Sequence, residues 1–476
     1  MFKFDDETIE RLFGADDAEN ETEERFKEYF YSNKAYEALI SALPVRVLVG
    51  HKGVGKSALL KMSYLEDLER GTPCIWLKPD ELVAARNEAS KSEDFILRIE
   101  AWKKGIMLEV ATQYIRKIYG GAALATVPEI VSGNPRDLAR LIIKFLDENG
   151  PNKKQPSENI INIYIDDIDR GWSATANDIR NISALLNAIR DIGGSNQRIR
   201  FRIGLRSDVY FLVRTSDEST DKIERNVIWL RWTNDDILRL AAKRIVTYFK
   251  MGISDDTIKG LTQAQISSQI LSKVITPIFA GRGKWENKPT YRILMSLTRA
   301  RPRDLVKLFH ASARRAYQID STIITTKNLE DSFEPYSQER LQDIINEFKS
   351  EMPDIKSLLL NMKPSKKARQ TIDNYLFNMG SLSQKLQQVM GNTNLRFSNG
   401  NHISPRSLTQ FLYKIDFITA RKEINGNIER KYFDESRFLA NDITDFGYDW
   451  EIHPAYRWAL QPQDIQSLIA SVAKDA

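Results

Sequence analysis

The chain has 476 residues, of which 42% are apolar and 28% are charged. This length is enough for roughly three domains, and the composition is typical of a folded globular protein rather than a disordered or fibrous one. Cys74 is the only cysteine, which excludes a disulfide framework, and four scattered histidines cannot complete a zinc site with one thiol.

Charge is unevenly distributed along the sequence. Residues 1–30 contain eleven acidic and four basic residues, so the net charge of +5 corresponds to +12 over the other 446 residues. A moderately basic body permits nucleic-acid binding but does not require it. No window approaches 18 uninterrupted apolar residues, and the acidic N-terminus is unlike a signal peptide. We therefore expect a cytoplasmic protein without membrane contact.

Residues 1–40 are predicted to form a helical segment that packs on the domain after it. Over residues 41–233, strand and helix signals alternate, with helical patterns at Asp94–Ile118 and Asp178–Ile192. Five runs rich in β-branched or aromatic residues predict strands at Val45–Val49, Cys74–Leu77, Ile160–Ile165, Ile199–Leu205 and Val227–Trp232. This alternation predicts an α/β domain in which helices cover both faces of a parallel five-stranded sheet.

A glycine-rich motif follows the first predicted strand. Gly50-His-Lys-Gly-Val-Gly-Lys-Ser57 matches the P-loop pattern G-x-x-x-x-G-K-[ST]. In such a loop, glycines let backbone N–H groups surround phosphate oxygens, and the next helix adds its positive end. Lys56 would neutralise β- and γ-phosphate charge, and Ser57 would bind Mg²⁺. The residues expected to contact nucleotide here are Gly50, Gly53, Val54, Gly55, Lys56, Ser57 and Ala58.

Two acidic residues end the third predicted strand. Asp166 is placed to bind Mg²⁺, and Asp167 is placed to polarise an attacking water. Either acid alone could equally cap a helix or lie at the surface, so their assignment depends on the P-loop. Asp169 and Arg170, which follow, could support the site, but solvated loop residues are the favoured interpretation for both.

Several arginines are candidates for contacting nucleotide. Arg206 ends the fourth predicted strand, where it could report the γ-phosphate, or it could form a structural pair with Asp208. Arg303 could close a lid over the nucleotide, or it could begin a helix together with Asp304. An arginine finger for a neighbouring subunit could come from Arg214, Arg225 or Arg231. The predicted catalytic set is Lys56, Asp166, Asp167 and Arg206.

The strand signal stops after residue 233. Residues 234–335 are predicted to form a helical lid, and residues 336–476 a helical and winged-helix-like α+β domain. Helices are expected in the lid at Asp235–Lys250, Ser267–Phe279, Lys288–Leu297 and Arg303–Tyr317.

The C-terminal region begins with an amphipathic helix near Gln338, followed by a basic joint at Lys363–Arg369. Ser404 fits the N-cap of a helix from Pro405 to Ile415. Asn425 and Gly426 lie between two alternating runs, which predicts a β-hairpin. A helix followed by a hairpin is typical of a winged helix.

Together the P-loop, the acid pair, the arginine after the fourth strand, the helical lid and the winged-helix pattern resemble the AAA+/STAND branch of P-loop ATPases. The chain also resembles a narrower prokaryotic group of P-loop ATPases, which is often encoded in mobile or antiphage defence loci. The residues that carry this resemblance are Phe13-Gly14, Ala18-Glu19, Glu21, Asp221-Lys222 and Ile452-His453-Pro454. The resemblance implies ATP with Mg²⁺, hydrolysis as a conformational switch, and homo-oligomers formed on nucleotide binding. It also implies adenine contacts near Phe13, Gly14 and Tyr36.

Two functions fit these patterns, and a third interpretation is a purely structural partner of an effector encoded elsewhere. The first is an ATP-hydrolysing switch that acts with an effector protein from the same operon, because the sequence shows no second catalytic constellation. The alternative is a nucleotide-gated DNA-binding protein with incidental hydrolysis. Its support is a set of polar and basic residues in the C-terminal domain: Arg406, Ser407, Lys414, Arg421, Lys422, Arg430 and Lys431. Asp416, Glu423 and Glu429 interrupt that surface, so contact with DNA and contact with protein both stay open.

Overall fold

The computed structural model describes residues 2–15, 21–120, 130, 133–216, 221–281, 285–364, 374–424, 427–436, 439 and 447–460. The chain divides into two compact units. One, here called the sheet unit, is Ser32–Leu230; the other, the helical unit, joins Met1–Tyr31 to Arg231–Ala476. No helix among the described residues is long and apolar enough to span a membrane.

Five parallel strands form the centre of the sheet unit, in the order β2-β3-β4-β1-β5. They are β1 (Val45–Gly50), β2 (Cys74–Leu77), β3 (Ile161–Ile165), β4 (Ile199–Arg206) and β5 (Val227–Trp229). Their residues are mostly apolar and buried, as parallel strands covered on both faces require. The predicted parallel five-stranded sheet is confirmed, although β5 ends at Trp229 rather than Trp232.

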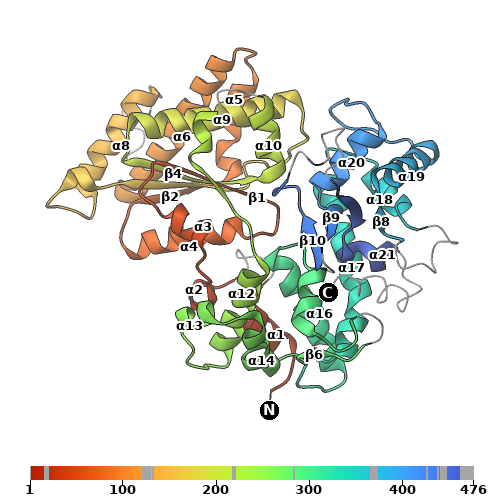
Figure 1. The fold of residues 1–476 in the computed structure, drawn as a ribbon. Helices are drawn as coiled ribbons and strands as arrows, with labels where there is room; N and C mark the ends of the chain where they lie inside the picture. Colours follow the sequence, from red (N-terminus) through yellow and green to blue (C-terminus); the bar gives the residue numbers. More distant parts are fainter. Residues whose placement is uncertain are drawn as a thin grey trace. The chain divides into compact units, whose positions relative to one another are not determined.

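Helices cover both faces of this sheet (Figure 1). One face carries α3 (Lys34–Leu39) and α4 (Lys56–Glu69), and the other carries α5 (Val83–Ser90), α6 (Phe95–Tyr119), α8 (Pro135–Asn149) and α9 (Ala176–Ser195). The sheet unit also contains η2 (Pro79–Leu82), η4 (Pro156–Glu158), α10 (Ser207–Ser216) and α11 (Asp221–Glu224). The helix predicted from Asp94 is confirmed, because Asp94 caps α6 by accepting a hydrogen bond from the backbone N–H of Ile96 at 2.8 Å.

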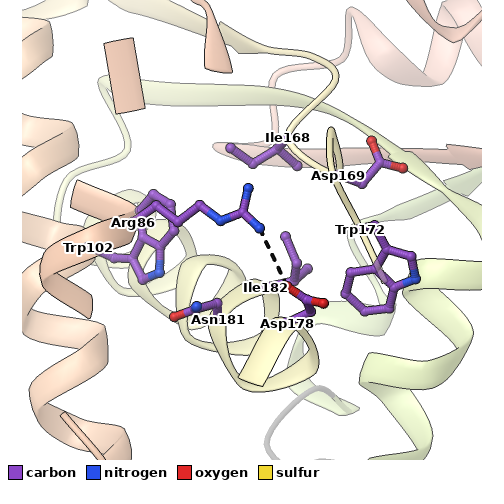
Figure 2. A pocket seen from close by; sticks show the side chains of 8 residues that line it. All are labelled: Arg86, Trp102, Ile168, Asp169, Trp172, Asp178, Asn181 and Ile182. Atoms are coloured by element: carbon purple, nitrogen blue, oxygen red, sulfur yellow. Dashed lines mark hydrogen bonds and ion pairs between the residues drawn. The ribbon is translucent and has the colours of Figure 1, made fainter. Parts of the chain in front are cut away.

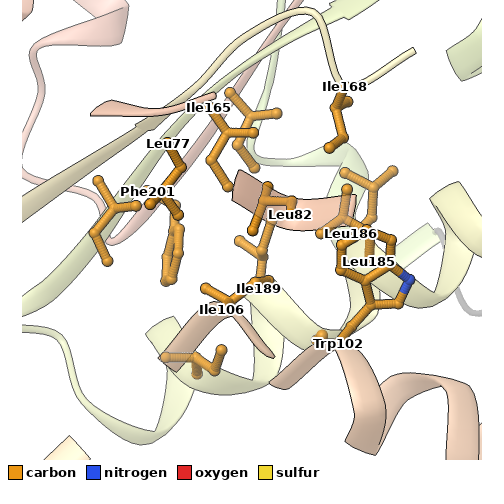
Figure 3. Packing of buried hydrophobic residues seen from close by; sticks show 14 of the residues in the cluster. Leu77, Leu82, Trp102, Ile106, Ile165, Ile168, Leu185, Leu186, Ile189 and Phe201 are labelled. Carbon is orange, nitrogen blue, oxygen red and sulfur yellow. The ribbon is translucent and has the colours of Figure 1, made fainter. Parts of the chain in front are cut away.

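The core of the sheet unit lies between the sheet and the helices α6 and α9 (Figure 3). Phe201 and Ile165 from the strands share one buried cluster with Trp102 of α6 and Leu185 of α9. Burying each large apolar side chain stabilises a fold by about 1.5–3 kcal/mol. This packing holds the strands, and therefore the loops at their ends, in fixed positions.

The sheet order brings three distant segments to one edge. β4 lies between β1 and β3, with Gly50 opposite Arg206 and Ile165 opposite Ile203. Since all five strands are parallel, their carboxyl ends meet at the same edge of the sheet. The P-loop after β1, the acid pair after β3 and the end of β4 are therefore neighbours.

The helical unit includes two helices from the N-terminal segment. They are α1 (Asp6–Phe13) and α2 (Glu23–Tyr29), which pack on α12 (Asn234–Tyr248) and α16 (Pro302–Gln318). The ring of Phe13 is buried and stacks on Phe309 with centroids 4.7 Å apart. α1 and α2 therefore group with the helical unit and α3 with the sheet unit. The packing of residues 1–40 on the domain after them stays a prediction.

The stretch after β5 is largely helical. After α12 it contains α13 (Asp255–Gly260), α14 (Gln263–Gln269), η6 (Leu271–Lys273), β6 (Ile278–Phe279), β7 (Lys288–Pro289), α15 (Thr290–Leu297), α16, α17 (Thr326–Phe348) and α18 (Ile355–Asn361). The helix predicted at Ser267–Phe279 is wrong, because Ile278 and Phe279 pair with β7 instead. The helix expected near Gln338 begins earlier, at Thr326, and spans the predicted boundary at residue 335.

The C-terminal region combines helices with a small antiparallel sheet. Its elements are β8 (Leu376–Phe377), α19 (Met379–Asn392), α20 (Pro405–Lys414), β9 (Ile418–Ile424), β10 (Asn427–Lys431), β11 (Asp449–Ile452), η10 (Pro454–Tyr456) and α21 (Arg457–Leu460), with sheet order β10-β9-β11-β8. Ser404 caps α20, as predicted, by accepting from the backbone N–H of Ser407 at 3.1 Å. The predicted hairpin is confirmed by the pairing of Ile424 with Asn427.

Some predictions fall on residues that the structure does not describe. They concern Ala18-Glu19, the hairpin residues Asn425-Gly426 and most of the joint Lys363–Arg369, of which only residues 363 and 364 are described. The winged-helix assignment and the four domain ranges stay predictions.

Candidate nucleotide-binding site

The P-loop connects β1 to α4 with two glycines in the left-handed region. Gly53 has a φ of 81° and Gly55 a φ of 95°, conformations that glycine adopts at little cost. α4 begins at Lys56, and no side chain caps its first turn. A helix N-terminus without a side-chain cap leaves backbone N–H groups available to an anion. The local backbone therefore has the form that the sequence motif predicts.

Lys56 folds back over the P-loop. Its ammonium group donates to the backbone carbonyl of Gly50 at 2.8 Å and to that of His51 at 3.0 Å. Gly50 is needed for close packing here, because a Cβ at this position would lie 2.9 Å from the Val54 side chain. The loop thus holds a positive charge among its own carbonyl groups, where a phosphate could take over the contacts.

The two predicted magnesium ligands lie side by side. Asp166 directly follows β3 and is buried. Burial raises the pKa of its carboxyl group, and hydrogen bonding from Ser57 opposes this shift. A buried carboxylate next to a hydroxyl is an oxygen donor set that suits Mg²⁺. The residues present therefore fit the metal that the motif implies.

Asp167 differs from Asp166 in both exposure and backbone. Its side chain is exposed, and its φ of 54° lies in the left-handed region, which aspartate tolerates better than most residues. The backbone then turns tightly, because the N–H of Arg170 donates to the carbonyl of Asp167 at 2.9 Å. Asp167 is thereby free to meet solvent beside the buried Asp166, while its role toward water stays a prediction.

Gly204 is a site residue that the sequence analysis missed. It lies in β4, opposite Leu48 of β1, and a Cβ there would overlap a carboxylate oxygen of Asp166. The same Cβ would lie 3.1 Å from the Leu60 side chain. A glycine inside a buried strand is a signal of close approach, and here the group that approaches is the predicted metal ligand.

Replacing Gly204 with alanine is expected to displace Asp166 and to destabilise the protein by about 1–3 kcal/mol through overpacking. Mg²⁺-dependent ATP hydrolysis and urea unfolding measure the two effects. Gly194→Ala is the matched control, because nothing lies within 4 Å of a Cβ there and the residue is in the last turn of α9. Unchanged hydrolysis in Gly204→Ala would show that Asp166 does not need this space.

Arg206 is paired with a carboxylate at the end of β4. Its guanidinium donates to both oxygens of Asp208, at 3.0 and 2.7 Å, in a bidentate pair. The carboxylate of Asp169 also lies near the guanidinium, 3.6 Å from Arg206 Nε. The structural pair that the sequence left open is therefore present, and a contact with phosphate stays a prediction.

Asp169 is not the solvated loop residue that was predicted. Its side chain is only 8% exposed. Burial raises its pKa to about 6, although Arg206 and Lys56 both act to lower it. Arg170, by contrast, is exposed as expected. The sequence could not show this difference, because the burial of Asp169 comes from its position beside β4.

The helical unit contains Arg303, in the first turn of α16 and half-buried. Its neighbour Asp304 is fully buried and accepts from Arg299 at 2.7 and 2.9 Å and from Arg340 at 3.0 Å. Burial by itself would raise the pKa of Asp304, but the two arginines outweigh it and hold the pKa well below its usual range. Asp304 is thus part of a buried ionic cluster between α16 and α17, while the role of Arg303 stays a prediction.

The basic residues proposed for DNA contact mostly have acidic partners. Glu451, which is buried, accepts from Arg430 at 2.9 Å and forms an ion pair with Arg457. Arg421 lies 3.9 Å from the same carboxylate. Lys414 pairs with Glu351, and Lys431 with Glu429 at 2.7 Å. These ion pairs reduce the positive charge that the helix and hairpin could offer to a phosphate backbone.

Comparison with protein families and curated proteins identifies two similarities. Residues 235–345 match the family described as the FunZ-associated C-terminal helical domain, a match that covers α12 to most of α17. The putative transposon gamma-delta 80.3 kDa protein of Escherichia coli (strain K12) is 23% identical over 384 residues. The match covers 72% of this chain and 52% of the relative, so the chain spans about half the length of that protein.

Solved structures with similarity to the chain include Cdc6p of Pyrobaculum aerophilum, which is 13% identical with a TM-score of 0.35 over 98% of both chains. The ORC2 protein of Aeropyrum pernix, in ADPNP-ADP complexes, is 11% identical with a TM-score of 0.38, over 90% of this chain and 87% of that chain. TM-scores below 0.5 do not establish a shared fold, so the fold rests on the chain's own sheet.

Proposed function

We propose that the protein binds and hydrolyses ATP with Mg²⁺ and uses the nucleotide to change its conformation or assembly. The observation that carries this proposal is the position of the buried Asp166 at the same edge of the sheet as the P-loop, where Lys56 and Ser57 of the loop both act on its carboxyl group. The order of the strands brings together the two residues assigned to the metal, although they are more than a hundred positions apart. A glycine-rich turn that does not bind phosphate would give no reason for a buried carboxylate beside it.

Each residue of the site has a distinct proposed role. Backbone N–H groups from Gly53 to Ala58 would surround the phosphates, and Lys56 would exchange its carbonyl partners for phosphate oxygens. Ser57 and Asp166 would hold Mg²⁺, which neutralises phosphate charge when bound. Asp167 would accept a proton from the attacking water. Arg206 would contact the terminal phosphate, which requires it to loosen its bond with Asp208.

The biological setting is proposed from the resemblance and from the curated relative. That relative is named a transposon protein, which agrees with a role in mobile-element biology. We propose a STAND-like switch in which Arg303 belongs to a lid over the nucleotide, and in which nucleotide favours homo-oligomers and controls an effector encoded nearby. A role in antiphage defence is the second setting that the resemblance implies. DNA binding is not part of this proposal, because the hairpin arginines pair with Glu451.

The test is to measure ATP hydrolysis by the purified full chain, both with and without DNA. The mass of the protein in solution is measured in the same experiment. We expect turnover that requires Mg²⁺, stops with EDTA and returns when excess Mg²⁺ is added. We also expect a larger mass with ATP than without nucleotide. Failure to bind ATP, or turnover that persists in EDTA, would contradict the proposal.

A further inference from the structure

Asp169 is a buried carboxylate next to the proposed site, and the roles proposed above do not use it. It follows the acid pair by two residues, and one of its oxygens, Oδ2, has no hydrogen-bond partner within the described part of the chain. The same oxygen forms an ion pair with Arg206 Nε at 3.6 Å, which is longer than a hydrogen bond. A buried carboxylate oxygen without a hydrogen bond is costly, so its retention beside an arginine calls for a physical reason.

The acid loop is anchored on both sides of Asp169. Ile168 and Trp172 are buried in the core, and the backbone N–H of Trp172 donates to the backbone carbonyl of Asp169 at 3.0 Å. Arg86 of α5 donates to the carbonyl of Arg170 at 3.2 Å. These contacts fix the backbone of Asp169 independently of any nucleotide.

The side chain of Asp169 is directed toward the end of β4. Figure 2 shows it at the edge of a small pocket that Trp172 and Ile182 also line, with its carboxylate turned away from Asp178 and Asn181. Arg206 and Lys56 are the two cations that act most strongly on this carboxylate. They are also the two cations proposed to meet the triphosphate.

The negative charge of Asp169 affects how Arg206 can bind a phosphate. Arg206 faces two carboxylates, Asp208 at hydrogen-bonding distance and Asp169 at 3.6 Å, so the three side chains together carry a formal charge of −1. A terminal phosphate that approaches Arg206 brings further negative charge into a poorly solvated region. It must therefore compete with Asp169 for the guanidinium, whereas ADP, which lacks that phosphate, does not.

From this geometry, and resting on the proposed function, we infer that Asp169 is a positioning residue that competes with the γ-phosphate for Arg206. It thereby lowers the preference of the site for ATP over ADP and couples the acid loop to the arginine of β4.

The test compares the dissociation constants of Mg-ADP and of a Mg-bound non-hydrolysable ATP analogue for the full chain. Asp169→Asn keeps the size and shape of the side chain but removes its charge. We expect the ratio of the ADP constant to the analogue constant to rise roughly three- to tenfold, the effect of one partly screened charge. An unchanged or smaller ratio would overturn the inference.

Two further variants separate positioning from other effects. Asp67→Asn is the matched control, because Asp67 is also buried in the sheet unit, where it accepts from Asn162 and Tyr164 at 2.7 Å. It should change stability but leave the nucleotide ratio as it is. In an Arg206→Gln background, Asp169→Asn should no longer change the ratio; a full effect there would show direct repulsion and reject the coupling through Arg206.

These outcomes are distinct from failure of the proposed function. If the unaltered protein binds neither nucleotide, the proposed function is wrong. If it binds both and the ratio does not respond to Asp169→Asn, only the role of Asp169 is wrong.

Discussion

Replacing Lys56 with alanine is expected to weaken ATP binding by roughly 10- to 100-fold and to remove measurable hydrolysis. The ammonium group of Lys56 reaches two carbonyls of the P-loop, at 2.8 and 3.0 Å. Hydrogen bonds between charged partners contribute about 1.5–3 kcal/mol, and each 1.4 kcal/mol is a factor of ten in affinity. Titration with a fluorescent ATP analogue measures the first effect and phosphate release the second.

Lys61→Ala is the control for this variant. Lys61 is half-buried on α4, one turn beyond the loop, so it reports the loss of a lysine from the same helix without a change in the loop. Its affinity for ATP should match that of the unaltered protein. Equal turnover in Lys56→Ala and in the unaltered protein would reject the assignment of this loop to phosphate.

Asp167→Asn should separate binding from hydrolysis. Asparagine has nearly the same shape and also tolerates the left-handed backbone at φ 54°, so the loop should keep its form. It cannot accept a proton from water, and loss of a general base typically lowers a rate by about 10²- to 10⁴-fold. We expect ATP affinity within about twofold of the unaltered protein together with this loss of turnover.

The same pair of measurements on Asp137→Asn provides the comparison. Asp137 is a half-buried acid on α8, paired with Arg140 at 3.5 Å, and lies outside the proposed site. In Asp137→Asn, neither the affinity for ATP nor the rate of ATP hydrolysis should change. If Asp167→Asn hydrolyses ATP at the normal rate, another group must activate the water, and the proposed role of the acid pair has to be abandoned.

Features encoded by neighbouring residues were predictable from the sequence. The P-loop depends on glycines at set spacings between a strand and a helix, and β1 and α4 lie on either side of it. The strands were predictable because a parallel strand buried on both faces is a short continuous apolar run. Ser404 capping α20 and the hairpin that pairs Ile424 with Asn427 follow from equally local rules.

Predictions from local sequence patterns were wrong where an apolar residue could pack against more than one part of the chain. Ser267–Phe279 has helical spacing, yet Ile275 forms a bridge with Ile324 and Phe279 pairs with Lys288. The apolar face of α1 was likewise visible in the sequence, but its partner was not. Phe13 stacks on Phe309, nearly three hundred residues later, and so α1 belongs to the helical unit. Periodicity identifies a face to be buried but not the surface that buries it.

The sequence by itself determined the sheet, the P-loop and the pair of acids, because each depends on residues close together in the chain. Only the tertiary structure placed β4 between β1 and β3. That order explains why residue 204 must lack a side chain beside Asp166, and why Asp169 is buried next to Arg206. Such contacts join residues 37 or 38 positions apart, and their formation depends on how the whole core packs, which no local pattern records.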